Sequence, residues 1–128
     1  MSLKDRLSVM VVDDMSVSRG LIIQALEAIG IRSIDYCNDG ETAFKRLAMT
    51  PVHLVISDYN MPGANGLQLL AGLRQYKTTQ RIGFILITGT ASAELIEQGR
   101  RLGMNNYLKK PFSEASLKAC IEQVVGPL

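Results

Sequence analysis

The chain has 128 residues, of which 47% are hydrophobic and 20% are charged, and its formal net charge is +2. This composition is typical of one folded domain and excludes a disordered chain. The apolar runs are too short to span a bilayer, and the Lys and Arg residues are too dispersed for a nucleic-acid binder.

The charge is unevenly divided along the chain. Residues 1–64 hold six basic and eight acidic side chains (6 − 8 = −2), whereas residues 65–128 hold eight basic and four acidic ones (8 − 4 = +4). This division favours an acidic site in the first half and a mildly basic face in the second.

The N-terminus and the cysteines indicate the expected compartment. Residues 1–8 are charged and lack the apolar core of a signal peptide. Two cysteines are too few for a disulfide scaffold or a structural zinc site. We therefore expect Cys37 and Cys120 to be free, buried thiols in a cytoplasmic protein.

Five apolar runs rich in β-branched residues alternate with stretches of helical periodicity. The predicted strands are residues 9–12, 34–37, 54–57, 83–88 and 106–109. The first, third and fourth are nearly continuous in Val, Ile and Leu, as is typical of strands covered on both faces.

The segments between the strands have the periodicity of amphipathic helices. Gly30 and Gly103 stand where helix-terminating glycines are expected, and Ser113 is a predicted N-cap. The apolar positions that define the five predicted helices are Leu21, Ile22, Ala25, Leu26 and Ile29; Ala43, Phe44, Leu47 and Ala48; Leu69, Leu70 and Leu73; Leu95, Ile96, Gly99 and Leu102; and Leu117, Cys120, Ile121 and Val124.

Alternating strands and helices predict an α/β fold with a parallel sheet covered on both faces. The short connections and the size favour a flavodoxin-like (βα)5 domain spanning residues 1–128, with strand order 2-1-3-4-5 and no output domain. In such folds the ligand binds beyond the carboxyl ends of the strands, where the strand order reverses.

Polar residues stand at these carboxyl ends. Asp13 and Asp14 follow the first strand, Asp58 the third and Lys110 the fifth, and Thr88 ends the fourth. Clustered carboxylates repel one another unless a cation is present, and an all-oxygen ligand set suits Mg²⁺. Asp58, beside a metal ion and a lysine, is placed to attack phosphorus as a nucleophile.

Alternatives to phosphoryl chemistry have weaker support. Neither a glycine-rich loop nor a G-x-x-x-x-G-K-S/T motif follows the first strand, which disfavours a nucleotide or flavin site. The single histidine, His53, precedes the third strand at the opposite end of the sheet. We therefore predict a structural role for His53.

Four motifs resemble the receiver domain of two-component response regulators, and the likeness is greatest to single-domain, CheY-like chemotaxis regulators. They are VVDD at 11–14, SDYNMPGANG at 57–66, ITGTA at 87–91 and YLKKPF at 107–112. The resemblance covers essentially the whole chain.

The resemblance implies a role for each site residue. Asp58 corresponds to the phosphoacceptor. Asp14, Asp58 and the Asn60 carbonyl correspond to ligands of Mg²⁺, with Asp13 acting through a water molecule. Thr88 would donate a hydrogen bond to the phosphoryl group and Lys110 would pair with it.

The tandem lysines require a choice between Lys109 and Lys110. Strand alternation turns only one of them to the site, and the family's lysine directly precedes the proline, so we choose Lys110. The resemblance also implies a cis Lys110–Pro111 bond and a switch aromatic at Tyr107. Thr90 departs from the acid found in well-known relatives, and this puts the phosphoryl lifetime in doubt.

The expected function is a stand-alone phospho-switch that catalyses only its own phosphorylation and dephosphorylation. Its expected partners are a CheA-like histidine kinase and a flagellar motor switch protein. The protein itself is expected to be a monomer. The expected partner face comprises the last two predicted helices and the fifth strand, around Ile96, Arg100, Tyr107, Lys109 and Lys118.

Two alternatives remain open. A phosphate sink or phosphorelay carrier without a motor target shares every site residue. A haloacid-dehalogenase-like phosphatase also uses an aspartate nucleophile but requires an acid two residues later, where this chain has Asn60.

Overall fold

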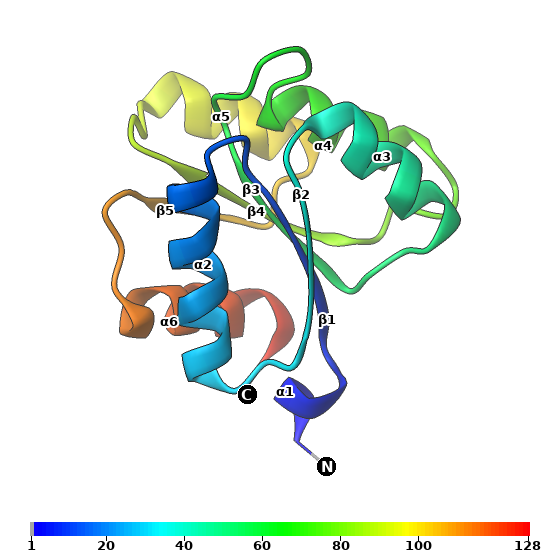
Figure 1. The fold of residues 1–128 in the computed structure, drawn as a ribbon. Helices are drawn as coiled ribbons and strands as arrows, with labels where there is room; N and C mark the ends of the chain where they lie inside the picture. The colour runs from blue at the N-terminus through cyan, green and yellow to red at the C-terminus, as the bar shows by residue number, and fades with distance from the viewer. Residues whose placement is uncertain (1) are drawn as a thin grey trace.

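A computed structural model describes residues 2–128 as a five-stranded parallel sheet covered by helices on both faces (Figure 1). The strand order is β2-β1-β3-β4-β5, so the predicted topology is confirmed. The strands are β1 (Ser8–Val12), β2 (Ser33–Cys37), β3 (Leu54–Asp58), β4 (Gly83–Thr88) and β5 (Asn106–Lys109). The helices are α1 (Leu3–Arg6), α2 (Ser16–Ile29), α3 (Gly40–Met49), α4 (Gly66–Gln75), α5 (Ala93–Leu102) and α6 (Glu114–Val125).

The helix ends have local causes that the sequence signals indicated. Gly30 and Gly103 adopt left-handed conformations, with φ of 106° and 98°, directly after α2 and α5. The Ser113 side chain accepts a hydrogen bond from the Ser116 N–H at the start of α6. Helix α1 was not predicted, because four residues are too few to display helical periodicity.

The alternation of side chains along the strands creates two apolar layers. Val9 and Val11 of β1 pack with the layer under α2 and α6, whereas Met10 and Val12 pack with the layer under α3, α4 and α5. Figure 1 shows these two groups of helices on opposite sides of the sheet. Both faces of the central strands are thus buried, which explains their continuous apolar sequence.

The free edge of the sheet at β2 is protected by side chains. Arg46 of α3 forms an ion pair with Asp35 and donates a 3.0 Å hydrogen bond to the Tyr36 carbonyl. The Tyr36 N–H donates a 2.8 Å hydrogen bond to the Asp35 carboxylate. Because both main-chain polar groups of Tyr36 are engaged, this part of the edge does not offer a template for strand addition.

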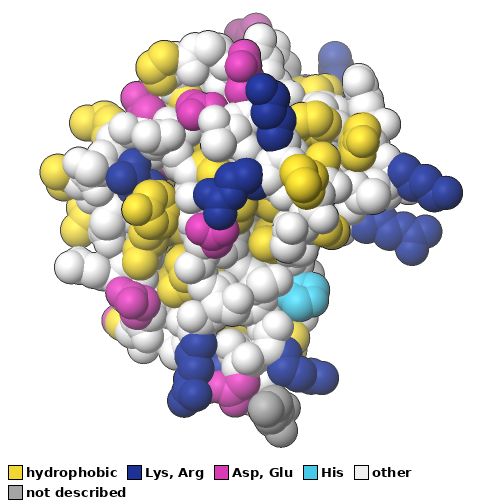
Figure 2. Space-filling view, turned by 45° about the vertical axis from the view of Figure 1, so that its right-hand side comes forward, with side chains coloured by type: hydrophobic (Ala, Val, Ile, Leu, Met, Phe, Trp, Pro, Cys, Tyr) yellow, Lys and Arg dark blue, Asp and Glu magenta, His cyan; other side chains and the backbone are white. Residues whose placement is uncertain are grey.

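Within residues 2–128, no helix is long and apolar enough to cross a membrane. On the face shown in Figure 2, Lys and Arg side chains are scattered among hydrophobic and neutral ones.

Both cysteines are free and buried, as expected. Burial raises the pKa of the Cys120 thiol to about 11, and burial also raises the pKa of Cys37. Both thiols therefore remain protonated at neutral pH and contribute to packing.

Candidate functional site

The strand register brings the predicted acidic residues together. Val12 of β1 lies beside Ser57 of β3, so the residues that follow them, Asp13 and Asp58, are neighbours at the carboxyl end of the sheet. One carboxylate oxygen from each of Asp13, Asp14 and Asp58 lies within 4.8 Å of the others. Asp13 and Asp58 are buried, whereas Asp14 is exposed, so the cluster opens to solvent on one side.

The polar contacts of Asp13 leave part of its carboxylate unsatisfied. Asp13 Oδ1 accepts a 3.0 Å hydrogen bond from the Met15 N–H, but the buried Oδ2 has no hydrogen-bond partner. An unsatisfied buried oxygen destabilises a protein by roughly 1–3 kcal/mol, and more when it is charged. This orphaned oxygen and its two neighbouring carboxylates fit a hard divalent cation such as Mg²⁺.

Lys110 approaches the acid cluster from the segment after β5. Its Nζ lies 3.3 Å from Asp58 Oδ1 and 3.7 Å from Asp13 Oδ2, and it donates a 2.8 Å hydrogen bond to Ser18 Oγ. Lys109 is exposed, and Lys110 is the one of the two lysines that lies at the cluster. The Lys110–Pro111 peptide is cis, as the resemblance implied.

The surroundings of Asp58 affect its protonation. Burial raises the pKa of the Asp58 carboxyl above its ordinary value, Lys110 acts in the opposite direction, and Asp13 raises it further. The Tyr59 N–H donates a 2.9 Å hydrogen bond to Oδ1 and favours the ionised form. A cation bound in the cluster would also favour the ionised carboxylate, which is the nucleophilic form.

Thr88 is buried at the end of β4, and its hydroxyl is engaged locally. Thr88 Oγ1 accepts a 3.1 Å hydrogen bond from the Thr90 N–H and donates a long, 3.3 Å one to the Thr90 carbonyl. The intervening Gly89 has open space where a Cβ would lie. Because residue 89 is a glycine, no side chain at this position obstructs access to Thr88.

The residues predicted for switching and partner binding differ in their exposure to solvent. Tyr107 of β5 is half-buried and packs against the layer under α3, α4 and α5. Ile96 of α5 is also half-buried, while Arg100 and Lys109 are exposed. Asn60 is exposed in the loop that follows β3, two residues after Asp58.

Three supporting residues make contacts that only the folded structure shows. A Cβ on Gly66 would lie 2.5 Å from the Asp58 carbonyl oxygen, so only glycine lets α4 start this close to β3. Arg19 donates a 2.9 Å hydrogen bond to the Asp13 carbonyl and stacks over the Tyr36 ring at 4.8 Å. Ser18, which contacts Lys110, carried no signal in the sequence.

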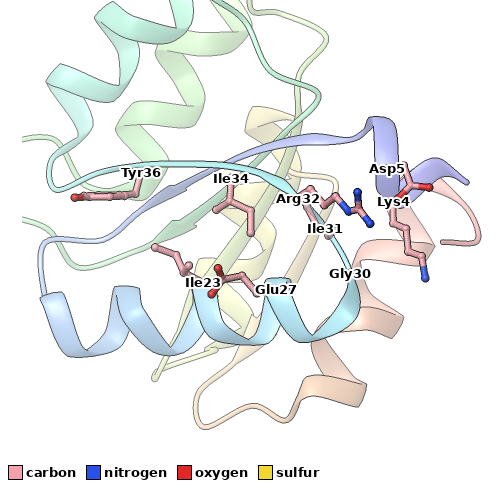
Figure 3. Close-up of a pocket in the computed structure, with 9 residues that line it drawn as sticks. All are labelled: Lys4, Asp5, Ile23, Glu27, Gly30, Ile31, Arg32, Ile34 and Tyr36. Carbon is pink, nitrogen blue, oxygen red and sulfur yellow. The ribbon is translucent and has the colours of Figure 1, made fainter. Parts of the chain in front are cut away.

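Two grooves flank α2, and one of them is lined in part by Lys110, the lysine beside the acid cluster. A groove of about 730 Å³ between β2 and α2 contains Lys4, Asp5, Glu27 and Arg32, whose charges have both signs (Figure 3). Tyr36 lies at one end of this groove and Lys4 at the other. A second, largely apolar groove of about 700 Å³ is lined by Met15, Val17, Ser18, Leu21, Lys110, Pro111 and Phe112, among others.

Comparison with known proteins identifies the family of the chain. The family model of the response regulator receiver domain matches residues 9–122. The probable chemotaxis protein CheY of Rhizobium etli is 39% identical over 128 residues, covering 100% of this chain and 99% of that protein. The chemotaxis protein CheY-3 of Vibrio cholerae is 30% identical over 122 residues, covering 95% and 94% respectively.

Solved structures share the fold. Chemotaxis protein CheY4 of Vibrio cholerae has a TM-score of 0.86 at 24% identity, covering 92% of this chain and 98% of that one. The receiver domain of a sensor histidine kinase from Pseudomonas aeruginosa has a TM-score of 0.84 at 25% identity, covering 94% and 98%, and holds a magnesium ion in its active-site cleft.

These matches decide between the families that the sequence left open. The haloacid-dehalogenase-like phosphatase is set aside, because the receiver model spans most of the chain and includes the acid cluster. Receiver domains of the CheY type are switch proteins rather than classical enzymes, and they imply a histidine kinase as phosphodonor. This chain belongs to the response regulator receiver domain family and is a CheY-like protein of two-component signalling.

Proposed function

We propose that this protein is a stand-alone phospho-switch of the chemotaxis type, which a CheA-like histidine kinase phosphorylates on Asp58. The observation that carries the proposal is the buried Asp58 carboxylate, with Lys110 Nζ at 3.3 Å and the unsatisfied Asp13 Oδ2 in the same cluster. This arrangement combines a nucleophile, a lysine ammonium and a set of carboxylate oxygens that could bind a metal cation.

The donor set of the cluster fits Mg²⁺. We assign Asp14, Asp58 and the Asn60 carbonyl as direct ligands, with Asp13 binding through a water molecule. When bound, Mg²⁺ would supply positive charge that offsets the charge on the phosphoryl oxygens during transfer.

Phosphoryl transfer requires one bond to form and one to break. An ionised oxygen of Asp58 attacks the phosphorus atom, and the P–N bond to the kinase histidine breaks, with its electron pair remaining on the imidazole nitrogen. Lys110 pairs with the oxygens of the transferred group. The Thr88 hydroxyl donates a hydrogen bond to one of these oxygens. This hydrogen bond replaces the long one that the hydroxyl now donates to the Thr90 carbonyl.

The output in this proposal is a change in surface. Movement of Thr88 toward the phosphoryl group would vacate space into which Tyr107 turns from its half-buried position. The altered face, which includes Ile96, Arg100 and Lys109, would then bind a flagellar switch protein. In this proposal the CheY-like protein acts as a cytoplasmic monomer. Phosphorylation shifts the population only by as much as the phosphoryl group prefers the active state.

Intact-mass spectrometry after incubation with acetyl phosphate tests the chemistry. We expect a single phosphoryl adduct on the wild-type protein with Mg²⁺ and none with a chelator or with Asp58→Asn. The matched control is Asp35→Asn, which removes an exposed carboxylate of the sheet edge and should retain the adduct. Absence of an adduct on the folded wild-type protein with Mg²⁺ would contradict the proposal.

The same sample separates a switch from a phosphate sink. For a switch, amide NMR signals around Tyr107 and Ile96 should move when the adduct forms. An adduct without any change in that region would favour a sink or a relay carrier, which needs no output face.

A further inference from the structure

The ammonium group of Lys110 has a neutral partner besides the two buried carboxylates. Its 2.8 Å hydrogen bond to Ser18 Oγ is shorter than its 3.3 Å distance to Asp58 Oδ1 and its 3.7 Å distance to Asp13 Oδ2. Ser18 lies in the first turn of α2, 92 residues before Lys110, and is half-buried. Figure 1 shows the start of α2 beside the segment that follows β5.

This hydrogen bond has a consequence for Asp13. The inner oxygen Oδ2 of Asp13 is buried without a hydrogen-bond partner, although an ammonium group lies only 3.7 Å away. A free lysine on a flexible stem would move onto such an oxygen, because a charged hydrogen bond in a buried site is favourable. Ser18 instead holds Nζ at the rim of the cluster.

An ammonium on Asp13 would also compete with a metal ion. Lysine and Mg²⁺ both seek the same carboxylate oxygens, and one cation bound close to Asp13 and Asp58 repels a second. The Lys110 ammonium can therefore pair with a phosphoryl group when it lies near Asp58, but it would weaken Mg²⁺ binding if it lay on Asp13. The side chain of Lys110 is 27% exposed and therefore has freedom to move. A single hydrogen bond, to Ser18, can then decide whether its ammonium lies near Asp58 or on Asp13.

We propose that Ser18 is a positioning residue, whose hydroxyl holds the Lys110 ammonium beside Asp58 and away from Asp13 Oδ2, so that this oxygen remains available to the metal site. This inference rests on the proposed function, because it deepens the role of Lys110 there. It concerns binding geometry and requires no change of protonation.

Calorimetric titration with MgCl₂ alone tests the tether without any phosphodonor. We expect Ser18→Ala to weaken Mg²⁺ binding about fivefold, the scale of one lost hydrogen bond, and Ser18→Thr to restore it to within about twofold because the hydroxyl is retained. The matched control is Ser16→Ala, which removes an exposed hydroxyl from the same turn of α2 and should leave Mg²⁺ binding unchanged.

A double-mutant cycle with Lys110→Met shows whether Ser18 acts through the lysine. In the Lys110→Met background, Ser18→Ala should no longer change Mg²⁺ affinity. Equal weakening with and without Lys110 overturns the proposal, as does wild-type affinity in Ser18→Ala or equal weakening in Ser16→Ala. Urea unfolding of each variant verifies that it is folded.

The mass spectrum tests the proposed function, and the Mg²⁺ titration tests the role of Ser18, so the two can fail independently. A wild-type protein that binds Mg²⁺ but forms no adduct with acetyl phosphate overturns the phospho-switch and leaves the Ser18 result intact. A wild-type protein without measurable Mg²⁺ affinity overturns the role given to Ser18, whatever the mass spectrum shows.

Discussion

The two ends of the sheet treat their polar groups in opposite ways. At the amino end, the Ser8 N–H donates a 3.0 Å hydrogen bond to His53 Nδ1, and the His53 N–H donates a 3.2 Å one to Ser8 Oγ. Arg74 of α4 donates to the carbonyls of Gly103 and Ile82 at distances of 2.7–3.1 Å. Polar groups at this end are thus satisfied within the chain.

At the carboxyl end, comparable polar groups are left incomplete. Asp13 Oδ2 has no hydrogen-bond partner, burial raises the pKa of Asp58, and two buried carboxylates share the charge of one half-buried lysine. The comparison shows that the polar groups of the amino end stabilise the fold, whereas the carboxyl end loses stability because it clusters carboxylates that can bind a cation.

The largest expected effect is at the amino end. Arg74→Ala removes the donors to the Gly103 and Ile82 carbonyls and should lower the free energy of unfolding by about 2–4 kcal/mol. Arg74→Lys should recover little, because an ammonium cannot reproduce the guanidinium fork. Urea unfolding measures both. If Arg74→Ala lowers the free energy of unfolding by less than about 0.5 kcal/mol, the polar groups of the amino end do not stabilise the fold as the comparison states.

Two glycines of α4 give a matched pair of intermediate effect. Gly66→Ala places a Cβ 2.5 Å from the Asp58 carbonyl, so it should destabilise by about 1–3 kcal/mol and slow phosphorylation by acetyl phosphate. Gly72→Ala meets only the Phe44 ring at 3.5 Å and should stabilise by up to about 1 kcal/mol through helix propensity. Similar unfolding curves for the two variants would show that the Asp58 backbone tolerates displacement.

The smallest effect concerns the carboxylate of Asp58. Because its pKa is raised in the folded state, the folded protein holds this proton more tightly than the unfolded chain. Its contribution to stability is present below the unfolded-state pKa and is lost as pH rises through the raised pKa. With a chelator present, Asp58→Asn should therefore gain about 1 kcal/mol over the wild type at neutral pH and less in mild acid.

The control for this comparison is Asp14→Asn, which removes the exposed carboxylate of the same cluster. Because this side chain is exposed, the stability of Asp14→Asn without metal at neutral pH should match that of the wild type to within about 0.5 kcal/mol. Saturating Mg²⁺ should raise the melting temperature of the wild type, because a ligand that binds only the folded state stabilises it. A gain in Asp58→Asn that does not depend on pH would exclude the carboxylate charge as its cause.

Much of the fold was predictable because its signals are local. The Val- and Ile-rich runs indicated β1, β3 and β4, and Gly30 and Gly103 indicated the ends of α2 and α5. The edge strand β2 was also predicted from a short β-branched run. Helix α1 escaped prediction because it is a single turn without an apolar face.

The acid cluster was predictable for a topological reason. Asp13, Asp14 and Asp58 directly follow or end buried strands, and parallel strands bring their carboxyl ends to one edge. Strand alternation placed one of the two tandem lysines at this edge, and the resemblance to receiver domains selected Lys110 over Lys109. The contacts of Ser18 and Gly66 were not predictable, because they arise from how α2 and α4 pack against segments remote in sequence.

The sequence alone therefore determined the type and order of the main elements, the two-sided burial of the central strands and the meeting of Asp13, Asp14 and Asp58 at one edge of the sheet. These properties follow from side-chain periodicity and from residues next to strand ends, which are local in the chain. Tertiary packing decided which oxygen of Asp13 stays unsatisfied, how Lys110 divides its contacts among Ser18, Asp58 and Asp13, and how closely α4 approaches β3. Such distances of a few ångströms depend on contacts between residues tens of positions apart, and no pattern within one segment encodes them.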